Sequence, residues 1–140
     1  MKINLIIVDD DEIDRYLLAR LAKKSRYDLV IREFESGGSF SESLHNPDSD
    51  LIGFLGEGAP AMAMLDINMP GMNGFDVVNE IRNAMQQQKL AADSLTVLIC
   101  SSSDHPQDQE AADRDELIHG YVVKPPTVEQ LDSLIHHHCC

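Results

Sequence analysis

The sequence predicts a single α/β domain built on a five-stranded parallel sheet, doubly wound with helices on both faces. Short apolar segments rich in β-branched residues alternate with longer segments of helical periodicity, and the alternation repeats five times. Most of these apolar segments are hydrophobic throughout, which is typical of strands buried on both sides. The chain has 140 residues, of which 43% are hydrophobic, and this suffices for the core of one domain.

Each expected strand is a short apolar run that stops at polar or turn-forming residues. The first run is continuous, the second alternates less cleanly, and the third stops at Asp66, before a loop that contains Pro-Gly and Asn-Gly. The fourth run is again continuous, and the fifth is short. In chain order, the expected strands are residues 3–8, 28–34, 61–65, 95–100 and 120–123.

Each expected helix places apolar residues three or four positions apart, so that they share one face. The second helical segment is interrupted by Asn-Pro-Asp, and we expect a helix broken or extended by a loop. The fourth is unusually hydrophilic, whereas the last opens with a capping box from Thr127 to Gln130. In chain order, the expected helices are residues 13–24, 40–55, 75–87, 107–116 and 128–135.

The net charge and the cysteines exclude several classes of protein. The charge of −13, from 11 basic and 24 acidic residues, repels nucleic acids and anionic membrane surfaces. No apolar run approaches the roughly 20 residues of a membrane-spanning helix. Cys100 lies in an apolar run and two cysteines end the chain, so we expect no disulfide and a cytoplasmic location. We expect residues 136–140, HHHCC, to be a frayed terminus rather than a soft-metal site.

Reactive side chains follow four of the five expected strands, at the carboxyl ends where the functional crevice of a doubly wound sheet lies. Taken singly, each is most simply a solvated loop residue, but chance does not readily explain why all of them fall on one edge. They are Asp9, Asp10 and Asp11 after the first strand, Asp66 after the third, Ser101, Ser102 and Ser103 after the fourth, and Lys124 and Pro125 after the fifth.

Carboxylates gathered at one point repel one another and require a cation. Hard oxygen ligands without clustered Cys or His side chains indicate Mg²⁺. Asp9 and Asp10 are paired like metal ligands, whereas Asp66 stands alone and is the best candidate for a nucleophile. Beside Mg²⁺ and a lysine, such a carboxylate can attack a phosphoryl group and form an aspartyl phosphate.

Four motifs lie at the carboxyl ends of the expected strands: Val8-Asp9-Asp10, LDINMPGMNG from Leu65, VLICSS from Val97 and GYVVKP from Gly120. Together they resemble the receiver domain of two-component response regulators. They follow the family's order and spacing over nearly the whole chain, and the segment from Asp66 to Gly74 is by itself highly specific. The resemblance implies a flavodoxin-like sheet of order 2-1-3-4-5.

The resemblance also implies the roles of the acidic residues. Asp66 is expected to accept the phosphoryl group from a phosphohistidine. Asp10 is expected to bind Mg²⁺ directly and Asp9 largely through water, while Asn68 offers its backbone carbonyl to the metal.

Further roles that the resemblance implies belong to the last two strands. Lys124 is expected to pair with the phosphoryl group, and its peptide bond to Pro125 is expected to be cis. Ser101 and Tyr121 are expected to be the switch residues. The hydroxyl of Ser101 would bond a phosphoryl oxygen, and the ring of Tyr121 would turn inward on activation.

The expected function is that of a stand-alone receiver over residues 1–140, with no output domain and no turnover beyond its own phosphorylation and dephosphorylation. The donor is expected to be a sensor histidine kinase or a histidine phosphotransfer protein. The output is expected to be altered affinity for a downstream protein at the face formed by residues 107–116, the fifth strand and the last helix. A phosphorelay stage or a phosphate sink are alternatives.

Three other classes fit the sequence less well. An FMN- or nucleotide-binding protein needs a phosphate loop after the first strand, where the acids Asp9 to Glu12 would repel phosphate. A haloacid-dehalogenase-like phosphatase needs a second acid two residues after the nucleophile. Here Asn68 holds that position, and an amide cannot serve as a general base. A receiver-shaped module that is never phosphorylated would not need the intact set of acids, Ser101 and Lys124.

Overall fold

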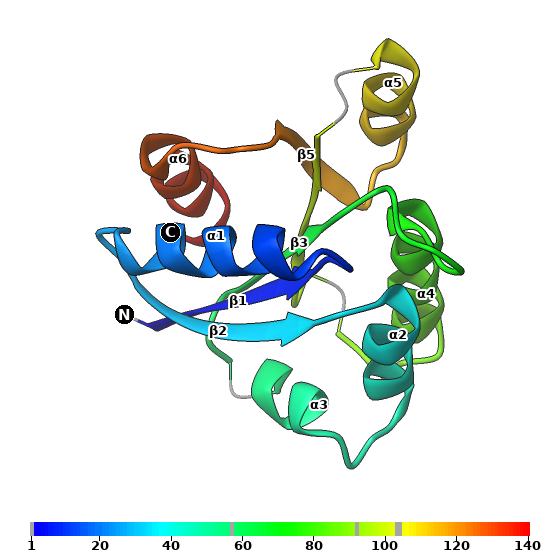
Figure 1. The fold of residues 1–140 in the computed structure, drawn as a ribbon. Coiled ribbons are helices and arrows are strands. Elements are labelled where there is room, and N and C mark those ends of the chain that lie inside the picture. Colours follow the sequence, from blue (N-terminus) through cyan, green and yellow to red (C-terminus); the bar gives the residue numbers. More distant parts are fainter. Residues whose placement is uncertain (1, 57, 92, 103–104) are drawn as a thin grey trace.

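Five parallel strands form the centre of the molecule, in the order β2-β1-β3-β4-β5 (Figure 1). The computed structural model describes residues 2–56, 58–91, 93–102 and 105–140. The predicted fold class and the flavodoxin-like sheet order are confirmed. The strands are β1 (Lys2–Val8), β2 (Asp28–Phe34), β3 (Ala61–Leu65), β4 (Thr96–Ser101) and β5 (Ile118–Val123).

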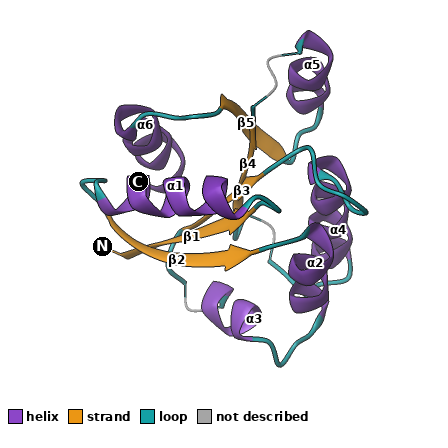
Figure 2. Ribbon diagram, in the orientation of Figure 1, coloured by secondary structure: helices purple, strands orange, loops and turns teal. Residues whose placement is uncertain are grey.

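Helices cover both faces of the sheet (Figure 2). On one face lie α1 (Glu12–Lys23) and α6 (Val128–Cys139), which bury side chains such as Leu18 and Leu131. On the other face Phe40 and Ile81 are among the buried side chains. The helices of that face are α2 (Gly37–His45), α3 (Asp50–Leu55), α4 (Gly74–Gln86) and α5 (Pro106–Arg114).

The burial of β1 explains why its sequence is apolar without alternation. Leu5 and Ile7 pack into the cluster under α1 and α6, whereas Ile6 and Val8 pack into the cluster on the opposite face. Because neighbouring residues of a strand point to opposite faces, a strand with helices on both sides favours apolar side chains at successive positions. Asn4 is the buried polar exception in β1, and its Nδ2 donates to the carbonyl of Phe54 at 3.4 Å.

Side-chain caps define where five of the helices begin, and those of α1, α4 and α6 lie at the ends of loops that carry predicted site residues or motifs. The Asp11 carboxylate accepts hydrogen bonds from two backbone N–H groups at the start of α1. Asn73 forms a capping box with Asp76 at α4, and Thr127 forms the predicted capping box with Gln130 at α6. These caps satisfy N–H groups that have no partner within the helix.

The expected break in the second helical segment is confirmed, since the segment forms two helices, α2 and α3. The structure corrects several other expected boundaries. Strand β5 begins two residues earlier than predicted, and α5 ends at Arg114. Both differences come from a turn at Asp115, whose carboxylate accepts the backbone N–H of Leu117 and pairs with Arg82. The expectation of a frayed terminus was wrong, because α6 continues to Cys139, which packs against the core.

Most large apolar side chains are buried, and most of the exceptions lie on one helix. Among the described residues, the exposed large hydrophobic side chains are Ile13, Tyr16, Leu17 and Val123, and the first three belong to α1. In the described part of the chain, no helix has the length and apolar character needed to cross a membrane. The exposed large apolar side chains of the described residues are therefore concentrated on α1.

Candidate functional site

The strand register brings the residues predicted from the sequence to one edge of the sheet. Val8 and Leu65, the last residues of β1 and β3, are paired. Ser101 and Val123, at the ends of β4 and β5, are also paired. The residues that directly follow β1, β3 and β5 are therefore neighbours in space: Asp9, Asp66 and Lys124.

Asp9, Asp10 and Asp66 form an acidic cluster at this edge. One carboxylate oxygen of each lies within 4.8 Å of the others. Asp9 and Asp66 are buried, whereas Asp10 is exposed. Within the described ranges, no other group of three His, Cys, Asp or Glu side chains comes so close together. The cluster is therefore the candidate functional site.

Lys124 is the cation of the site. Its Nζ lies 2.5 Å from Oδ2 of Asp9, 3.0 Å from Oδ2 of Asp14 and 3.5 Å from Oδ1 of Asp66. Its side chain is only 9% exposed. The Lys124 ammonium group therefore lies closer to the carboxylates of Asp9 and Asp14 than to that of Asp66. A single positive charge faces three negative charges.

The charge state of Asp66 reflects this balance. The pKa of Asp66 is raised from 3.8 to about 6, and burial is the largest cause; the Asp9 carboxylate also raises this pKa, while the Lys124 ammonium lowers it. Burial lowers the pKa of Lys124, but its hydrogen bonds to Asp9 and Asp14 outweigh burial, so the net direction is upward. Lys124 thus stays charged, while the ionised form of Asp66 is destabilised.

The loop after Asp66 is held against the start of α4. The backbone N–H of Asn68 donates to the Asp66 carboxylate, although the Asn68 residue itself is exposed. The N–H of Gly74 donates to the carbonyl of Ile67 at 3.1 Å. A Cβ on Gly74 would lie 2.6 Å from the carbonyl oxygen of Asp66, so only glycine allows α4 to begin this close to the acidic cluster.

Ser101 and Tyr121 lie on the same side of the sheet. Ser101 is fully buried, and its carbonyl accepts the backbone N–H of Lys124 at 2.8 Å. Tyr121 is paired with Ile99 and packs against the core on the α4 side, and Ser101, two residues beyond Ile99, points to that side too. The peptide bond from Lys124 to Pro125 is cis. Ser103, also predicted at this edge, lies outside the described residues.

Two residues of α1 that support the site were missing from the sequence prediction. Asp14 shares the Lys124 ammonium with Asp9. Arg15 donates from Nη1 to the backbone carbonyl of Asp9 at 2.7 Å. Both lie one turn after the cap at Asp11, where the start of a helix is still close to the preceding strand end, and this position was a signal that could have identified them.

The donor atoms of the acidic cluster fit a hard divalent cation. The carboxylates of Asp9, Asp10 and Asp66 supply oxygen, the ligand atom that Mg²⁺ prefers. Because Lys124 offsets only part of their charge, a divalent cation would remove the remaining repulsion. The exposed position of Asp10 leaves one side open to water, and Mg²⁺ usually keeps several of its waters.

Comparison with known proteins agrees with this arrangement. A family model described as the response regulator receiver domain matches residues 5–136. Nitrate/nitrite response regulator protein NarL of Escherichia coli K12 is 25% identical over 132 residues, which cover 94% of this chain and 52% of that protein. Sensory transduction protein LytT of Oceanobacillus iheyensis is 28% identical over 90 residues, which cover 64% and 32%. The chain thus spans about a third to a half of the length of these curated relatives.

A solved structure with the same architecture is that of a two component response regulator from Cytophaga hutchinsonii. It superposes with a TM-score of 0.80 and 26% sequence identity. The superposition covers 96% of this chain and 95% of the other, so the likeness extends over the whole sheet and its helices.

Proposed function

This chain belongs to the response regulator receiver domain family, and on that premise we propose that it accepts a phosphoryl group on Asp66 from a phosphohistidine and thereby changes its affinity for another protein. The observation that carries the proposal is the environment of Asp66. It is a buried carboxylate 3.5 Å from the Lys124 ammonium and within 4.8 Å of two further carboxylates.

The proposed transfer uses groups that are already in place. One Asp66 oxygen forms a bond to phosphorus while the bond from phosphorus to the imidazole nitrogen breaks, and that nitrogen keeps the electron pair. Lys124, held by Asp9 and Asp14, is close enough to Asp66 to pair with an oxygen of the incoming group. The amide of Asn68 cannot activate water as a base, which favours an aspartyl phosphate that persists.

We propose Mg²⁺ as the cofactor, held by the carboxylates of Asp9, Asp10 and Asp66 and by the backbone carbonyl of Asn68. When bound, Mg²⁺ supplies positive charge that offsets the charge on the phosphoryl oxygens. Asp9 is buried and already fixed by Lys124 and by the backbone N–H of Asp11, so it enters such a site with little loss of side-chain freedom.

The exposed apolar face of α1 supports a protein as the phosphoryl donor. Ile13, Tyr16 and Leu17 are exposed beside the acidic cluster. A cavity of about 320 Å³ between α1 and the Lys124–Pro126 turn includes Leu17 and Lys124 in its lining. A sensor histidine kinase or histidine phosphotransfer protein could bury this apolar surface while presenting its phosphohistidine to Asp66. The three free cysteines fit a cytoplasmic location for that encounter.

The proposed output begins at Ser101 and Tyr121. A phosphoryl group on Asp66 adds negative charge and acceptor oxygens, which Ser101 can bond only if the end of β4 moves inward. Such a shift changes the packing available to Tyr121, since both residues face the same side of the sheet. We propose that the face formed by α5, β5 and α6 consequently changes its affinity for a downstream protein.

Intact-mass measurement tests the acceptor. With Mg²⁺ and acetyl phosphate, the protein should gain one phosphoryl group, and Asp66→Asn should gain none. Asp113→Asn makes the same chemical change at an exposed site on α5 and should label like the wild type. Equal labelling of Asp66→Asn and the wild type would disprove the assignment. Removal of Mg²⁺ should also abolish labelling, because Lys124 by itself offsets only part of the charge gathered around Asp66.

Amide exchange with and without a beryllofluoride mimic tests the output. We expect altered protection in α5, in β5 and at the start of α6. Changes limited to the loops that carry Asp9 and Asp66 would contradict the switch and favour the role of a phosphate sink. If this chain acts as one stage of a phosphorelay, it should transfer its phosphoryl group to a purified histidine phosphotransfer protein.

A further inference from the structure

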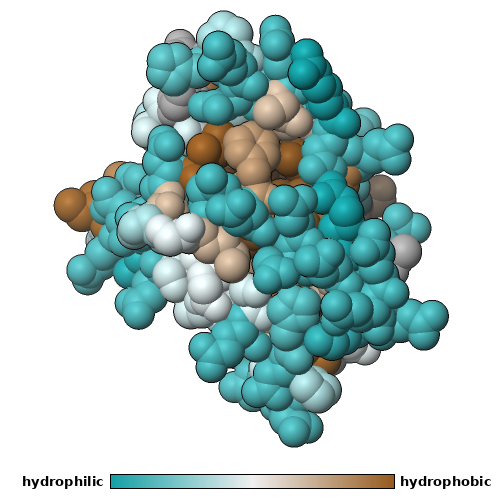
Figure 3. Space-filling model, turned by 90° about the vertical axis from the view of Figure 1, so that its right-hand side faces the viewer, coloured by the Kyte–Doolittle hydropathy of each residue, from teal (hydrophilic) through white to brown (hydrophobic). Residues whose placement is uncertain are grey.

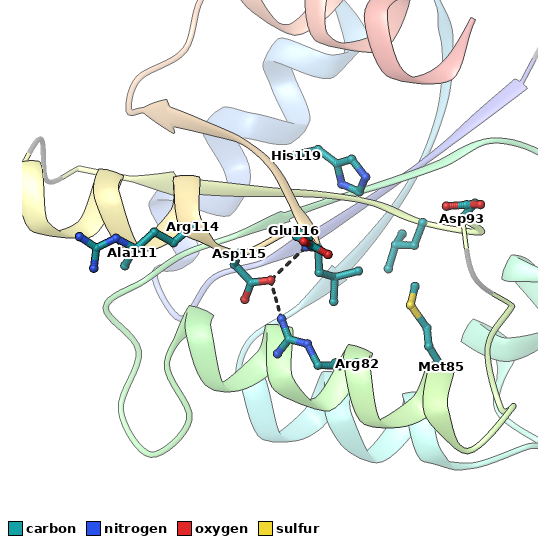
Figure 4. A pocket seen from close by; sticks show the side chains of 10 residues that line it. Arg82, Met85, Asp93, Ala111, Arg114, Asp115, Glu116 and His119 are labelled. Atoms are coloured by element: carbon teal, nitrogen blue, oxygen red, sulfur yellow. Dashed lines mark hydrogen bonds and ion pairs between the residues drawn. The ribbon is translucent and has the colours of Figure 1, made fainter.

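A groove of about 690 Å³ separates α4 from α5 and the turn that leads into β5 (Figure 4). None of the residues that line it belongs to the acidic cluster or contacts Lys124. In Figure 3, which views the side of the molecule that carries α4 and α5, hydrophobic side chains are visible in a depression surrounded by hydrophilic surface. The groove is therefore an opening to apolar interior that the proposed phosphorylation does not use.

The groove stays open because α5 is held to the sheet by very little apolar surface. Of its nine residues, Ala112 is the only buried one. The contact across the groove is the ion pair between Nη2 of Arg82 on α4 and Oδ1 of Asp115 after α5, at 2.5 Å. This ion pair joins α4 to the turn after α5 but leaves the apolar side chains between the two helices uncovered.

The lining combines an apolar floor with an acidic rim. Met85, Leu95 and Leu117 contribute apolar side chains. Asp93 and Glu116 contribute carboxylates, and in the described part of the chain no Lys or Arg lies within ion-pair distance of either. Of the two arginines of the lining, Arg82 pairs with Asp115, and Arg114 lies 3.9 Å from Glu110 in an exposed pair. The three carboxylates of the lining outnumber its two guanidinium groups, so the net charge that a ligand meets is negative.

We propose that this α4–α5 groove binds a basic amphipathic segment of a partner protein. An apolar side chain of that segment lies on Met85, Leu95 and Leu117, and its Lys or Arg side chains pair with Asp93 and Glu116. Charge complementarity identifies the occupant as basic, because the rim is acidic and the whole chain carries −13. The volume is within the range of sites that hold a few side chains of a ligand.

The test uses a fluorescein-labelled helical peptide of Leu, Ala and Lys with leucines on one face, at physiological salt and with the unphosphorylated protein. A peptide with Glu in place of Lys is its counterpart. The variant Asp93→Asn/Glu116→Gln removes two charges from the rim. Asp28→Asn/Glu42→Gln removes the same charge at exposed positions on β2 and α2, away from the groove.

The Lys peptide should bind and the Glu peptide should not. The rim variant should weaken binding by about fivefold, as expected for loss of two exposed ion pairs, whereas the matched control should change it less than about twofold. In ¹⁵N-labelled protein, shifts on addition of the Lys peptide should concentrate at residues 82–85, 93–95 and 111–119. No binding, equal weakening by both double variants, or shifts spread over all acidic surfaces would overturn the proposal, since the peptide would then respond only to net charge.

Discussion

The helices α4 and α5 each follow a strand that ends at the acidic cluster, yet they are held to the sheet in different ways. α4 comes after Asp66, starts with a capping box and has five buried residues, among them Val77 and Ile81. α5 comes after Ser101 and has one buried residue, Ala112. At His105, where α5 begins, no side-chain cap is formed by the residues that the structure describes.

The surroundings of the acidic cluster therefore include a firmly packed helix, α4, which follows Asp66, and a loosely packed helix, α5, which follows Ser101. Each fully buried branched side chain of α4 contributes roughly 1.5–3 kcal/mol, whereas the single methyl group of Ala112 contributes about 0.8 kcal/mol. Segments with few buried apolar contacts open at low free-energy cost. Asp66, the proposed phosphoacceptor, therefore has a rigid support in α4, and α5, which follows the proposed switch residue Ser101, is the helix that can move readily.

The largest expected effect is on the packing of α4. Ile81→Ala should lower the free energy of unfolding by about 3 kcal/mol, because it empties a fully buried position in the main core cluster. Ala112→Gly on α5 should lower it by about 1 kcal/mol, mostly through helix propensity. Urea denaturation of both variants measures the difference. Equal losses would show that α5 is as firmly packed as α4.

A second prediction concerns the start of α4. Gly74→Ala should cost about 2 kcal/mol, because the new Cβ would lie 2.6 Å from the Asp66 carbonyl oxygen and force the helix away. The matched change Gly38→Ala, in α2, meets only the Ser36 hydroxyl at 3.9 Å and should be neutral or slightly stabilising. Thermal melts compare the two. A neutral Gly74→Ala would mean that α4 can shift as freely as α5.

A third prediction concerns the Asp66 carboxylate and the pH dependence of stability. The folded-state pKa of Asp66 is raised to about 6, so between about pH 4 and 6 the folded protein holds a proton that the unfolded chain has lost. In the metal-free protein, stability should therefore fall as pH rises through this window. At pH 7, Asp66→Asn should be more stable than the wild type by on the order of 2 kcal/mol.

The difference in unfolding free energy between Asp66→Asn and the wild type should vanish below about pH 4. There Asp66 becomes protonated in the unfolded chain as well as in the folded protein. Asp10→Asn, at an exposed carboxylate, should have a smaller effect. Urea denaturation from about pH 3 to pH 8 provides the comparison. Added Mg²⁺ should stabilise the wild type more than Asp66→Asn. An identical pH profile for both proteins would contradict the buried, repulsive environment of Asp66.

The smallest expected effect is at the start of α5. His105→Asp places a capping carboxylate before the helix and should stabilise the protein by about 0.5–1 kcal/mol. It should also slow amide exchange in α5 and leave exchange in α4 unchanged. Removal of the existing cap by Asn73→Ala is the reciprocal variant and should destabilise α4 by about 1 kcal/mol. If His105→Asp leaves α5 exchange unchanged, capping does not limit the stability of that helix.

Much of the fold and of the candidate site follows from local signals in the sequence. The continuous apolar run of β1 predicts a strand covered on both faces, and the capping box at Thr127 marks the start of α6. The convergence of Asp9, Asp66 and Lys124 follows from parallel strands whose carboxyl ends meet at one edge. The part that Asp14 plays was not predicted, because Asp14 lies on α1 and not at the end of a strand, and its contact with Lys124 depends on how α1 packs beside the sheet.

By itself, the sequence determined the strands, their order through the family resemblance, and the acidic cluster at their carboxyl ends, since periodicity and motifs are local properties. Only the tertiary structure decided how strongly each element is held. The hydrophilic sequence of α5 predicts a helix, but the single buried Ala112 and the open groove beside Arg82 depend on what α4 and the β5 turn leave uncovered. The continuation of α6 to Cys139 likewise depends on packing against the core, a contact between distant segments that no local pattern encodes.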